Sequence, residues 1–132
     1  MATKKDYDDI PGTYVFDADM SRKGYHLNMF CITLRLATGR EAFKADESGY
    51  LDGFPMTPAQ KQAVLDRDWN EMLRLGGNIY YTSKLGACDG ITFQALAAMM
   101  SGSTQEEYRA MMLAGGRPIE GNRYKSEWEG KE

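Results

Sequence analysis

The stretch MTPAQ at residues 56–60 carries the clearest structural signal in the sequence. Thr57 is suited to be an N-cap, Pro58 then takes the first helical position, and Gln60 is the third residue after the cap. Together they predict a helix start, because the Thr and Gln side chains can each bond a backbone N–H that the helix leaves unpaired. The glycine pair at residues 76–77 predicts the end of this helix, since glycine readily adopts the left-handed conformation found there.

Similar signals predict two helices before this point. The first is expected from Asp17 or Asp19 to about Leu36, and Gly24 is expected to loosen it. Residues at helical spacing are predicted to form its buried face: Tyr25, Met29, Ile32 and Leu36. A capping box of Thr38 with Glu41 predicts the second helix, which carries Phe43, Tyr50, Leu51 and Phe54 and stops at Pro55. On the helix that follows Thr57, four residues are predicted to be buried: Leu65, Trp69, Met72 and Leu73.

Three shorter helices are predicted in the second half, over residues 78–85, 89–100 and 103–115. Each begins at a residue whose side chain can cap a helix: Asn78, Asp89, and Ser103 paired with Glu106 as a capping box. Glycine at position 102 and the pair at 115–116 predict the ends of the last two helices.

These elements predict an all-α fold without a sheet. We expect one multihelical domain over residues 1–132, with about five or six helices in a core at residues 8–117. The apolar run at residues 14–16 is interpreted as an extended anchor. Residues 118–132 are interpreted as a polar tail, in which Tyr124 and Trp128 are candidates for contact with a partner.

Charge and composition exclude several classes of function. A net charge of −3 does not favour nucleic acid, whose phosphates attract basic proteins. No apolar run approaches the roughly 18 residues that a membrane-spanning helix needs. The opening residues carry no apolar stretch like that of a secretory signal, so we expect a cytoplasmic protein in which Cys31 and Cys88 are reduced thiols in or near the core.

Nine methionines are many for 132 residues. Methionine fills gaps in cores and is also common on adaptable binding surfaces. We interpret most of them as core residues. An interface is the alternative, because adjacent methionines at positions 99–100 and 111–112 point about 100° apart on a helix.

The sequence offers little for catalysis by this chain alone. Zinc and non-haem iron sites need several histidines, cysteines or carboxylates, and His26 is the one histidine. The acidic stretches DADMS (17–21) and ADES (45–48) are the alternative for an all-oxygen Mg²⁺ site, but neither has EF-hand spacing. We interpret both as carboxylates favoured at helix starts, and predict no metal site and no catalytic residue.

Other reactive groups have simple structural interpretations. His26 and Cys31 are five residues apart and so lie on different helix faces, while a pair of His26 with Cys88 would need a tertiary contact. The two glycine pairs lack the spacing of a phosphate-binding loop. Tyr80 and Lys84 are helical neighbours and form a candidate acid–base pair, for which the simpler interpretation is a solvated lysine beside a buried tyrosine.

Seven collinear blocks between residues 8 and 117 resemble the small alpha subunit of protocatechuate 4,5-dioxygenase. The blocks are DDIPGTYVF (8–16), RKGYHLNMF (22–30), FKADESGYLD (43–52), MTPAQKQAVLDRDWNEML (56–73), GGNIYYTSKL (76–85), DGITFQ (89–94) and GSTQEEYRAMMLAGGR (102–117). Each block alone is a weak signal, whereas seven in the same order with matching gaps form a strong one.

This resemblance implies an all-α subunit that pairs with a larger catalytic beta subunit, in an alpha2beta2 heterotetramer. In that family the beta subunit holds Fe(II) on two histidines and a glutamate and also supplies the catalytic base. The enzyme opens a catechol-type ring by extradiol cleavage with O2, and the alpha subunit closes over the mouth of the site. The resemblance agrees with the single histidine here, which cannot form an iron site alone.

The resemblance also implies which residues of this chain approach the substrate. The phenylalanine of the DGITFQ block, Phe93, reaches toward the ring, and Ile91 and Thr92 line the same entrance. An aromatic edge there can shape a pocket and exclude water. The alternative is a core phenylalanine at helical spacing from Leu96 and Ala97. Ile91 and Thr92 stand where better-known members carry a more polar pair, a departure that bears on substrate preference.

Two further hypotheses belong to different classes. The chain can be a helical binding or regulatory module that kept the fold but serves another partner, or a small stand-alone enzyme. A stable complex with a beta subunit, and the absence of ring cleavage by the isolated chain, would favour the dioxygenase subunit over both.

Overall fold

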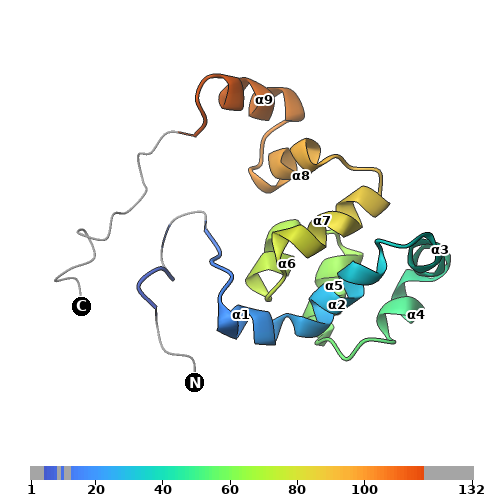
Figure 1. The fold of residues 1–132 in the computed structure, drawn as a ribbon. Coiled ribbons are helices and arrows are strands. Elements are labelled where there is room, and N and C mark those ends of the chain that lie inside the picture. The colour runs from blue at the N-terminus through green and yellow to red at the C-terminus, as the bar shows by residue number, and fades with distance from the viewer. Residues whose placement is uncertain (1–4, 9, 11–12, 118–132) are drawn as a thin grey trace.

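The computed structural model describes residues 5–8, 10 and 13–117. These residues form nine α-helices and no strand (Figure 1). The helices are α1 (Ala18–Lys23), α2 (Tyr25–Thr33), α3 (Ala37–Ala45), α4 (Glu47–Leu51), α5 (Pro58–Leu65), α6 (Trp69–Arg74), α7 (Ile79–Cys88), α8 (Phe93–Met100) and α9 (Gln105–Leu113). The prediction of an all-α fold is therefore confirmed. The predicted tail at 118–132, with Tyr124 and Trp128, lies outside the described residues.

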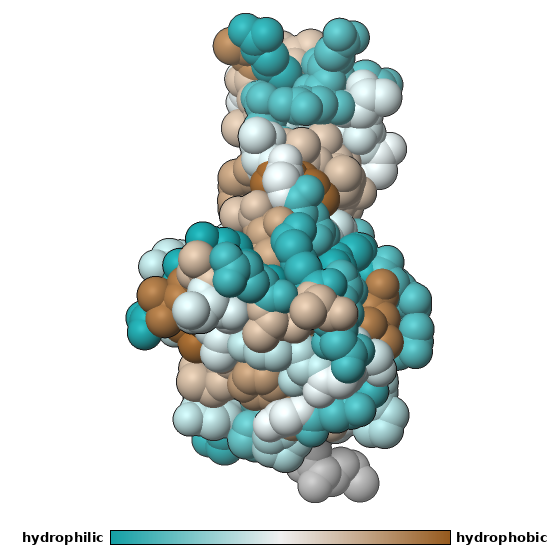
Figure 2. Space-filling model, turned by 90° about the vertical axis from the view of Figure 1, so that its right-hand side faces the viewer, coloured by the Kyte–Doolittle hydropathy of each residue, from teal (hydrophilic) through white to brown (hydrophobic). Residues whose placement is uncertain are grey.

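The helices form a bundle and a projecting arm. Helices α1–α7 pack together, whereas α8 and α9 form a helical hairpin that extends away from them (Figure 1). Figure 2 shows the same division as a broad body joined to a narrower upper part. We call α1–α7 the bundle and α8–α9 the arm. Apart from Leu96 and Ala98 of α8, the buried apolar residues described belong to the bundle and the turns within it.

The core is built around an aromatic cluster. Phe30 of α2 is fully buried, and its ring centre lies 5.1 Å from that of Phe43, 6.0 Å from that of Tyr50 and 5.7 Å from that of Phe54. Tilted and edge-on ring pairs at such distances add to the stability that burial provides. Met72 of α6 is the one fully buried methionine among the described residues. Met56 and Met100 are partly buried against the core, whereas Met99 and Met112 are exposed. The core interpretation therefore holds for some of the methionines but not for Met99 and Met112.

The first long helix is divided at Gly24, and its buried face differs from the prediction. Tyr25 and Leu36 are exposed, so the predicted stripe is wrong. The apolar residues that α2 and the turn after it bury are spaced i, i+3, i+4 and i+7: Leu27, Phe30, Cys31 and Leu34. Both stripes are apolar in sequence, and only the packing against α7 and the aromatic cluster selects one of them.

Close backbone contact explains the break at Gly24. A Cβ atom at Gly24 would lie 1.9 Å from the carbonyl oxygen of Gly76, which follows α6. Two buried amides reinforce this junction. Asn28 donates to the Gly76 carbonyl at 3.1 Å, and Gln60 donates to the carbonyls of Lys23 and Leu75, both at 2.9 Å. The ends of α1 and α6 are therefore joined by hydrogen bonds within the bundle.

The capping box at Thr57 and Gln60 is confirmed, and so is the Asn78 cap of α7. The predicted number of helices was too low because Gly24 divides the first predicted helix and polar residues interrupt two others. Asp46 caps α4 and separates it from α3, and Asp68 caps α6 and separates it from α5. The proposed capping box of Thr38 with Glu41 is wrong, because α3 already begins at Ala37 after Leu36, without a side-chain cap.

Two corrections concern the arm. Thr92, not Asp89, is the N-cap of α8, and its side chain accepts a hydrogen bond from the Ala95 N–H at 3.1 Å. In α9 the capping box consists of Thr104 and Glu107, one residue beyond the predicted pair of Ser103 and Glu106. The predicted glycine ends of both helices are confirmed, because Gly102 and Gly115 take positive φ values just past them.

The apolar residues 14–16 form neither helix nor strand, and their side chains are exposed. They therefore do not insert into the core as an anchor would. In the part of the chain that the structure describes, no helix combines the length and apolar character needed to cross a lipid bilayer.

Candidate functional site

Three residues are expected near the substrate. Ile91 and Thr92 lie in the turn between α7 and α8, and Phe93 follows them as the first residue of α8. The turn is fixed by backbone hydrogen bonds. The Gly90 N–H donates to the Ala87 carbonyl at 3.0 Å, and the Ile91 N–H donates to the Gly86 carbonyl at 2.9 Å. This pair is the Schellman motif, which requires a left-handed residue after the helix, and Gly90 provides it with φ of 80°.

The three residues have different environments. Ile91 is half-buried and packs against the core, whereas Thr92 is exposed and uses its hydroxyl to cap α8. Phe93, the first residue of α8, is 61% exposed. The alternative that Phe93 is a core residue is therefore wrong. The turn presents one aromatic ring to the surroundings on a backbone that the neighbouring residues hold in place.

Asp89 anchors the start of this turn from the side. It is the C-cap of α7 and not, as predicted, the cap of α8. Its two carboxylate oxygens accept hydrogen bonds from Arg67, at 2.6 Å from Nε and 3.2 Å from Nη2. The helix dipole disfavours a carboxylate at this position, the C-terminus of α7, so the bonds from Arg67 offset an unfavourable placement.

Arg67 links three helix ends. Besides Asp89 after α7, its guanidinium donates to both carboxylate oxygens of Glu47, the first residue of α4, at 3.0 and 2.8 Å. It also donates to the Val64 carbonyl at 2.8 Å and lies 5.4 Å from the ring centre of Phe43. Partial burial lowers the pKa of Arg67, but the hydrogen bonds to Asp89 and Glu47 outweigh it and raise the pKa overall.

The other reactive side chains show no catalytic arrangement. Burial raises the pKa of Cys31 to about 12 and also raises the pKa of Cys88, so both thiols are poor nucleophiles at neutral pH. His26 is exposed on α2 and lies beside Tyr25. Across residues 5–8, 10 and 13–117, no three side chains of His, Cys, Asp or Glu come together to hold a metal ion.

Tyr80 and Lys84 contact each other, but not as an acid–base pair. The Lys84 ammonium lies 4.4 Å from the centre of the Tyr80 ring, a cation–π contact. Tyr80 is 64% exposed, so the interpretation of it as a buried tyrosine is wrong.

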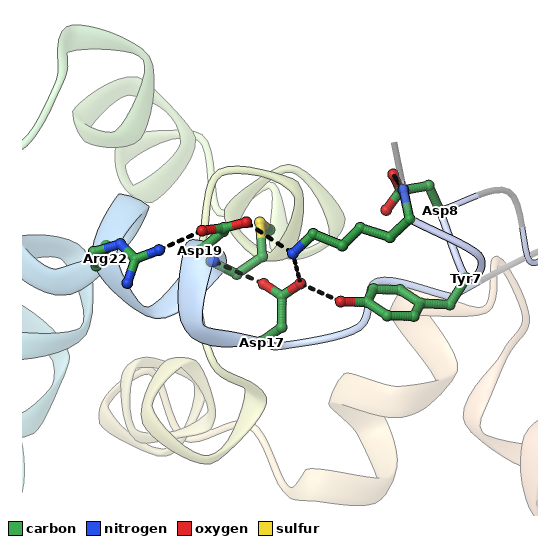
Figure 3. Close-up of polar contacts among 7 residues, drawn as sticks. Tyr7, Asp8, Asp17, Asp19 and Arg22 are labelled. Atoms are coloured by element: carbon green, nitrogen blue, oxygen red, sulfur yellow. Dashed lines mark hydrogen bonds and ion pairs between the residues drawn. The ribbon is translucent and has the colours of Figure 1, made fainter. Parts of the chain in front are cut away.

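A second polar cluster ties the N-terminal segment to α1 (Figure 3). Lys5 donates to Asp17 at 3.0 Å and to Asp19 at 2.7 Å, and Tyr7 donates to Asp17. The hydrogen bond from Tyr7 is the largest cause that lowers the pKa of Asp17, while the bond from Lys5 lowers that of Asp19. These residues line an open cavity of about 250 Å³ together with Tyr14 and Arg74. We interpret the cluster as a structural clamp.

Arg67 was not predicted from the sequence, and its partners were interpreted only as a helix cap (Asp89) and as a helix-start carboxylate (Glu47). A local signal was present: an arginine between two aspartates, DRD at residues 66–68, which forms the connection between α5 and α6. What could not be read from the sequence is that Glu47 and Asp89, 20 positions before and 22 positions after Arg67, meet at its side chain.

The fold and the site define the class: a small helical protein whose candidate site presents an exposed aromatic turn and, among its described residues, no assembled metal site. Residues 27–113 match the family described as aromatic-ring-opening dioxygenase LigAB, LigA subunit. Because the match covers more than half of the chain, the protein belongs to this family. The resemblance found in the sequence blocks is thereby confirmed.

A gallate dioxygenase of Pseudomonas putida is 25% identical to the chain over 99 residues, which make up 75% of this chain. The same alignment covers 29% of the gallate dioxygenase, so the chain spans less than a third of that relative's length. The family description is that of one subunit of an aromatic-ring-opening dioxygenase, and the relative is named as a dioxygenase.

Proposed function

We propose that this chain is the non-catalytic alpha subunit of an Fe(II) extradiol dioxygenase that cleaves protocatechuate or a close analogue with O2. A larger beta subunit holds the iron and the catalytic base, and this chain covers the mouth of that site. The observation that carries the proposal is the exposure of Phe93 on the fixed α7–α8 turn, in a member of a family of dioxygenase subunits.

The residues of this chain do not fit an iron site of their own. The one histidine is exposed on α2, and the described carboxylates form no cluster around it. We therefore assign the Fe(II) to the partner and none of the chemical steps to this chain.

The contribution of this chain is to shape and dry the entrance. The Phe93 ring offers an apolar edge against an aromatic substrate, and Ile91 and Thr92 fix the backbone beneath it. Excluding water from the entrance strengthens electrostatic interactions inside the site and limits side reactions. Substrate preference then depends on the shape of this wall as well as on the groups of the beta subunit.

The test replaces Phe93 with alanine in the assembled enzyme. We expect Phe93→Ala to change KM or the preference between protocatechuate and gallate by about tenfold, because an aromatic wall of the pocket is removed. Tyr25→Ala is the matched control, since Tyr25 is an equally exposed aromatic on α2. Equal substrate constants for the wild type and Phe93→Ala would contradict the assignment of Phe93 to the pocket.

Assembly is tested separately from the substrate contact. Mass spectrometry of the native complex should give two copies of each subunit, and the isolated chain should neither bind stoichiometric iron nor open the ring. Ring cleavage by the isolated chain would refute the non-catalytic role.

The second candidate is a helical binding or regulatory module that serves a different partner. The observation that favours it is that α9 buries no residue in the described structure and so offers surface to a partner. Size-exclusion chromatography with the beta subunit separates the two: a chain that stays alone beside the beta subunit supports the module. We also propose a cytoplasmic location, on the ground that Cys31 and Cys88 are free thiols.

A further inference from the structure

Arg67 occupies a backbone position that normally belongs to glycine. Five helices in the described structure end with the same pair of hydrogen bonds, from the first residue after the C-cap and from the residue that follows it. In four of them the first of these residues is a glycine with positive φ: Gly76, Gly90, Gly102 and Gly115. In the fifth, at the end of α5, it is Arg67 with φ of 53°, the one positive φ of a non-glycine residue described.

A left-handed conformation is strained for an arginine, because its Cβ crowds the following carbonyl. Glycine at position 67 would relieve that strain without changing the two backbone bonds, in which the Arg67 N–H donates to Val64 and the Asp68 N–H donates to Ala63. The side chain must therefore supply the reason for arginine. A strained residue retained for its side chain points to a role in function.

The side chain reaches the turn that carries Phe93. It bonds both carboxylate oxygens of Asp89, which stands four residues before Phe93 and directly before the left-handed Gly90. Asp89 is itself unfavourably placed at the C-terminus of α7. Two locally unfavourable choices, at positions 67 and 89, are thus offset by one paired contact between them.

We propose that Arg67 is a positioning residue for ring cleavage: its paired hydrogen bonds to Asp89 fix the α7–α8 turn and thereby set where the Phe93 ring stands over the substrate. This role rests on the proposed function of Phe93. Glu47, bonded on the other side, holds the guanidinium but does not touch the turn.

The structure provides a matched pair of variants. Asp89→Ala and Glu47→Ala each remove one carboxylate whose two oxygens accept hydrogen bonds from Arg67. Each variant leaves the other carboxylate bonded to Arg67. The assembled enzyme is assayed for the ratio of kcat/KM on protocatechuate to that on gallate. Asp89→Ala should shift this ratio by about threefold or more, and Glu47→Ala should leave it unchanged.

The shift should depend on Phe93. In a Phe93→Ala background, Asp89→Ala should no longer change the ratio, because there is no ring left to position. Arg67→Lys, which keeps the charge but loses the paired geometry, should behave as Asp89→Ala does. Thermal unfolding and size-exclusion chromatography check that each variant folds and assembles. If an Arg67 variant does not fold, Asp89→Ala alone tests the proposal.

The outcomes separate this role from the proposed function. If Phe93→Ala moves the ratio but Asp89→Ala does not, the positioning role is overturned while the role of Phe93 stands. If Asp89→Ala and Glu47→Ala shift the ratio equally, or Asp89→Ala acts just as strongly without Phe93, Arg67 is only a structural tie. If Phe93→Ala itself has no effect, the proposed function fails, and the positioning role fails with it.

Discussion

Helices α2 and α9 have the same length of nine residues, yet one is buried and the other is not. Four residues of α2 are buried within the bundle, whereas no residue of α9 is buried in the described structure. On the arm, Met112 and Leu113 are among the exposed apolar side chains, and Leu113 is 78% exposed. Figure 2 shows the corresponding shape, a narrow extension above a broad body.

This difference indicates that core packing stabilises one part of the chain, whereas local contacts and helix caps stabilise another. A helix of nine residues is too short to be stable alone in water, so α2 depends on the core. For α9, the contacts with α8, the capping box and the glycine end are what the described chain provides. An exposed apolar arm fits a subunit that completes its packing with a partner, as the proposed function requires. Three matched pairs of variants and one pH experiment test this contrast.

The largest effect is expected in the core. Phe30→Ala should lower the free energy of unfolding by about 3–5 kcal/mol, because it removes a fully buried ring from the aromatic cluster. Leu113→Ala on the arm should change it by less than about 0.5 kcal/mol. Urea unfolding of the isolated chain measures both. An equally large loss for Leu113→Ala would show that the arm belongs to the same folding unit in a way its exposure does not indicate.

The second comparison uses two glycines. Gly24→Ala should destabilise the chain by about 1–3 kcal/mol or more, because a Cβ at Gly24 meets the backbone of Gly76. Gly102→Ala, at the end of α8, should cost about 1 kcal/mol through its positive φ alone, since a Cβ there has open space. Thermal unfolding distinguishes them. If the order were reversed, close packing at the α1–α6 junction would not control stability.

The third comparison uses the two capping boxes. Thr57→Ala and Thr104→Ala each remove an N-cap, which contributes about 1 kcal/mol. In the bundle the loss should lower the global unfolding free energy, whereas in the arm it should increase only local opening. Hydrogen exchange of α9 amides would reveal this as faster exchange without a change in the melting temperature. A lower melting temperature for Thr104→Ala would contradict a separately opening arm.

The smallest effect concerns pH and the clamp at the N-terminal segment. Because the pKa of Asp17 lies below its usual value of 3.8 in the folded chain, the bonds from Tyr7 and Lys5 stabilise that segment above this pH. Their contribution is lost as the pH falls below 3.8 toward the folded pKa. NMR signals of Tyr7 should shift in that range while core signals persist, and Asp17→Asn should abolish the shift.

Local sequence signals worked best where neighbouring residues alone decide the structure. The capping box at Thr57 and Gln60 and the glycine ends of α6, α8 and α9 follow from side chains and φ preferences within a few residues. The same logic failed by one residue at Thr104 and by three at Thr92, where adjacent polar residues compete for the same role. The choice between them depends on where the preceding helix ends.

The candidate site illustrates the same division. The resemblance identified Phe93, but the exposure of its ring and the core contact of Ile91 emerged only with the turn in place. Arg67 was missed because its partners are distant in the sequence and because an arginine gives no local sign that it will take a left-handed backbone. Its contacts exist only when the ends of α4, α5 and α7 meet.

Three properties could be predicted from the sequence alone: that the chain is helical, where several helices begin and end, and that one histidine is too few for an iron site. They could be predicted because helix caps, φ preferences and ligand counts are local or additive properties. Three others became visible with the tertiary structure: which of two apolar stripes on α2 is buried, that α9 buries no residue of its own, and that Arg67 bonds Asp89 in the turn before Phe93. These depend on which surfaces meet, and burial and paired charges arise from contacts between residues far apart in the chain.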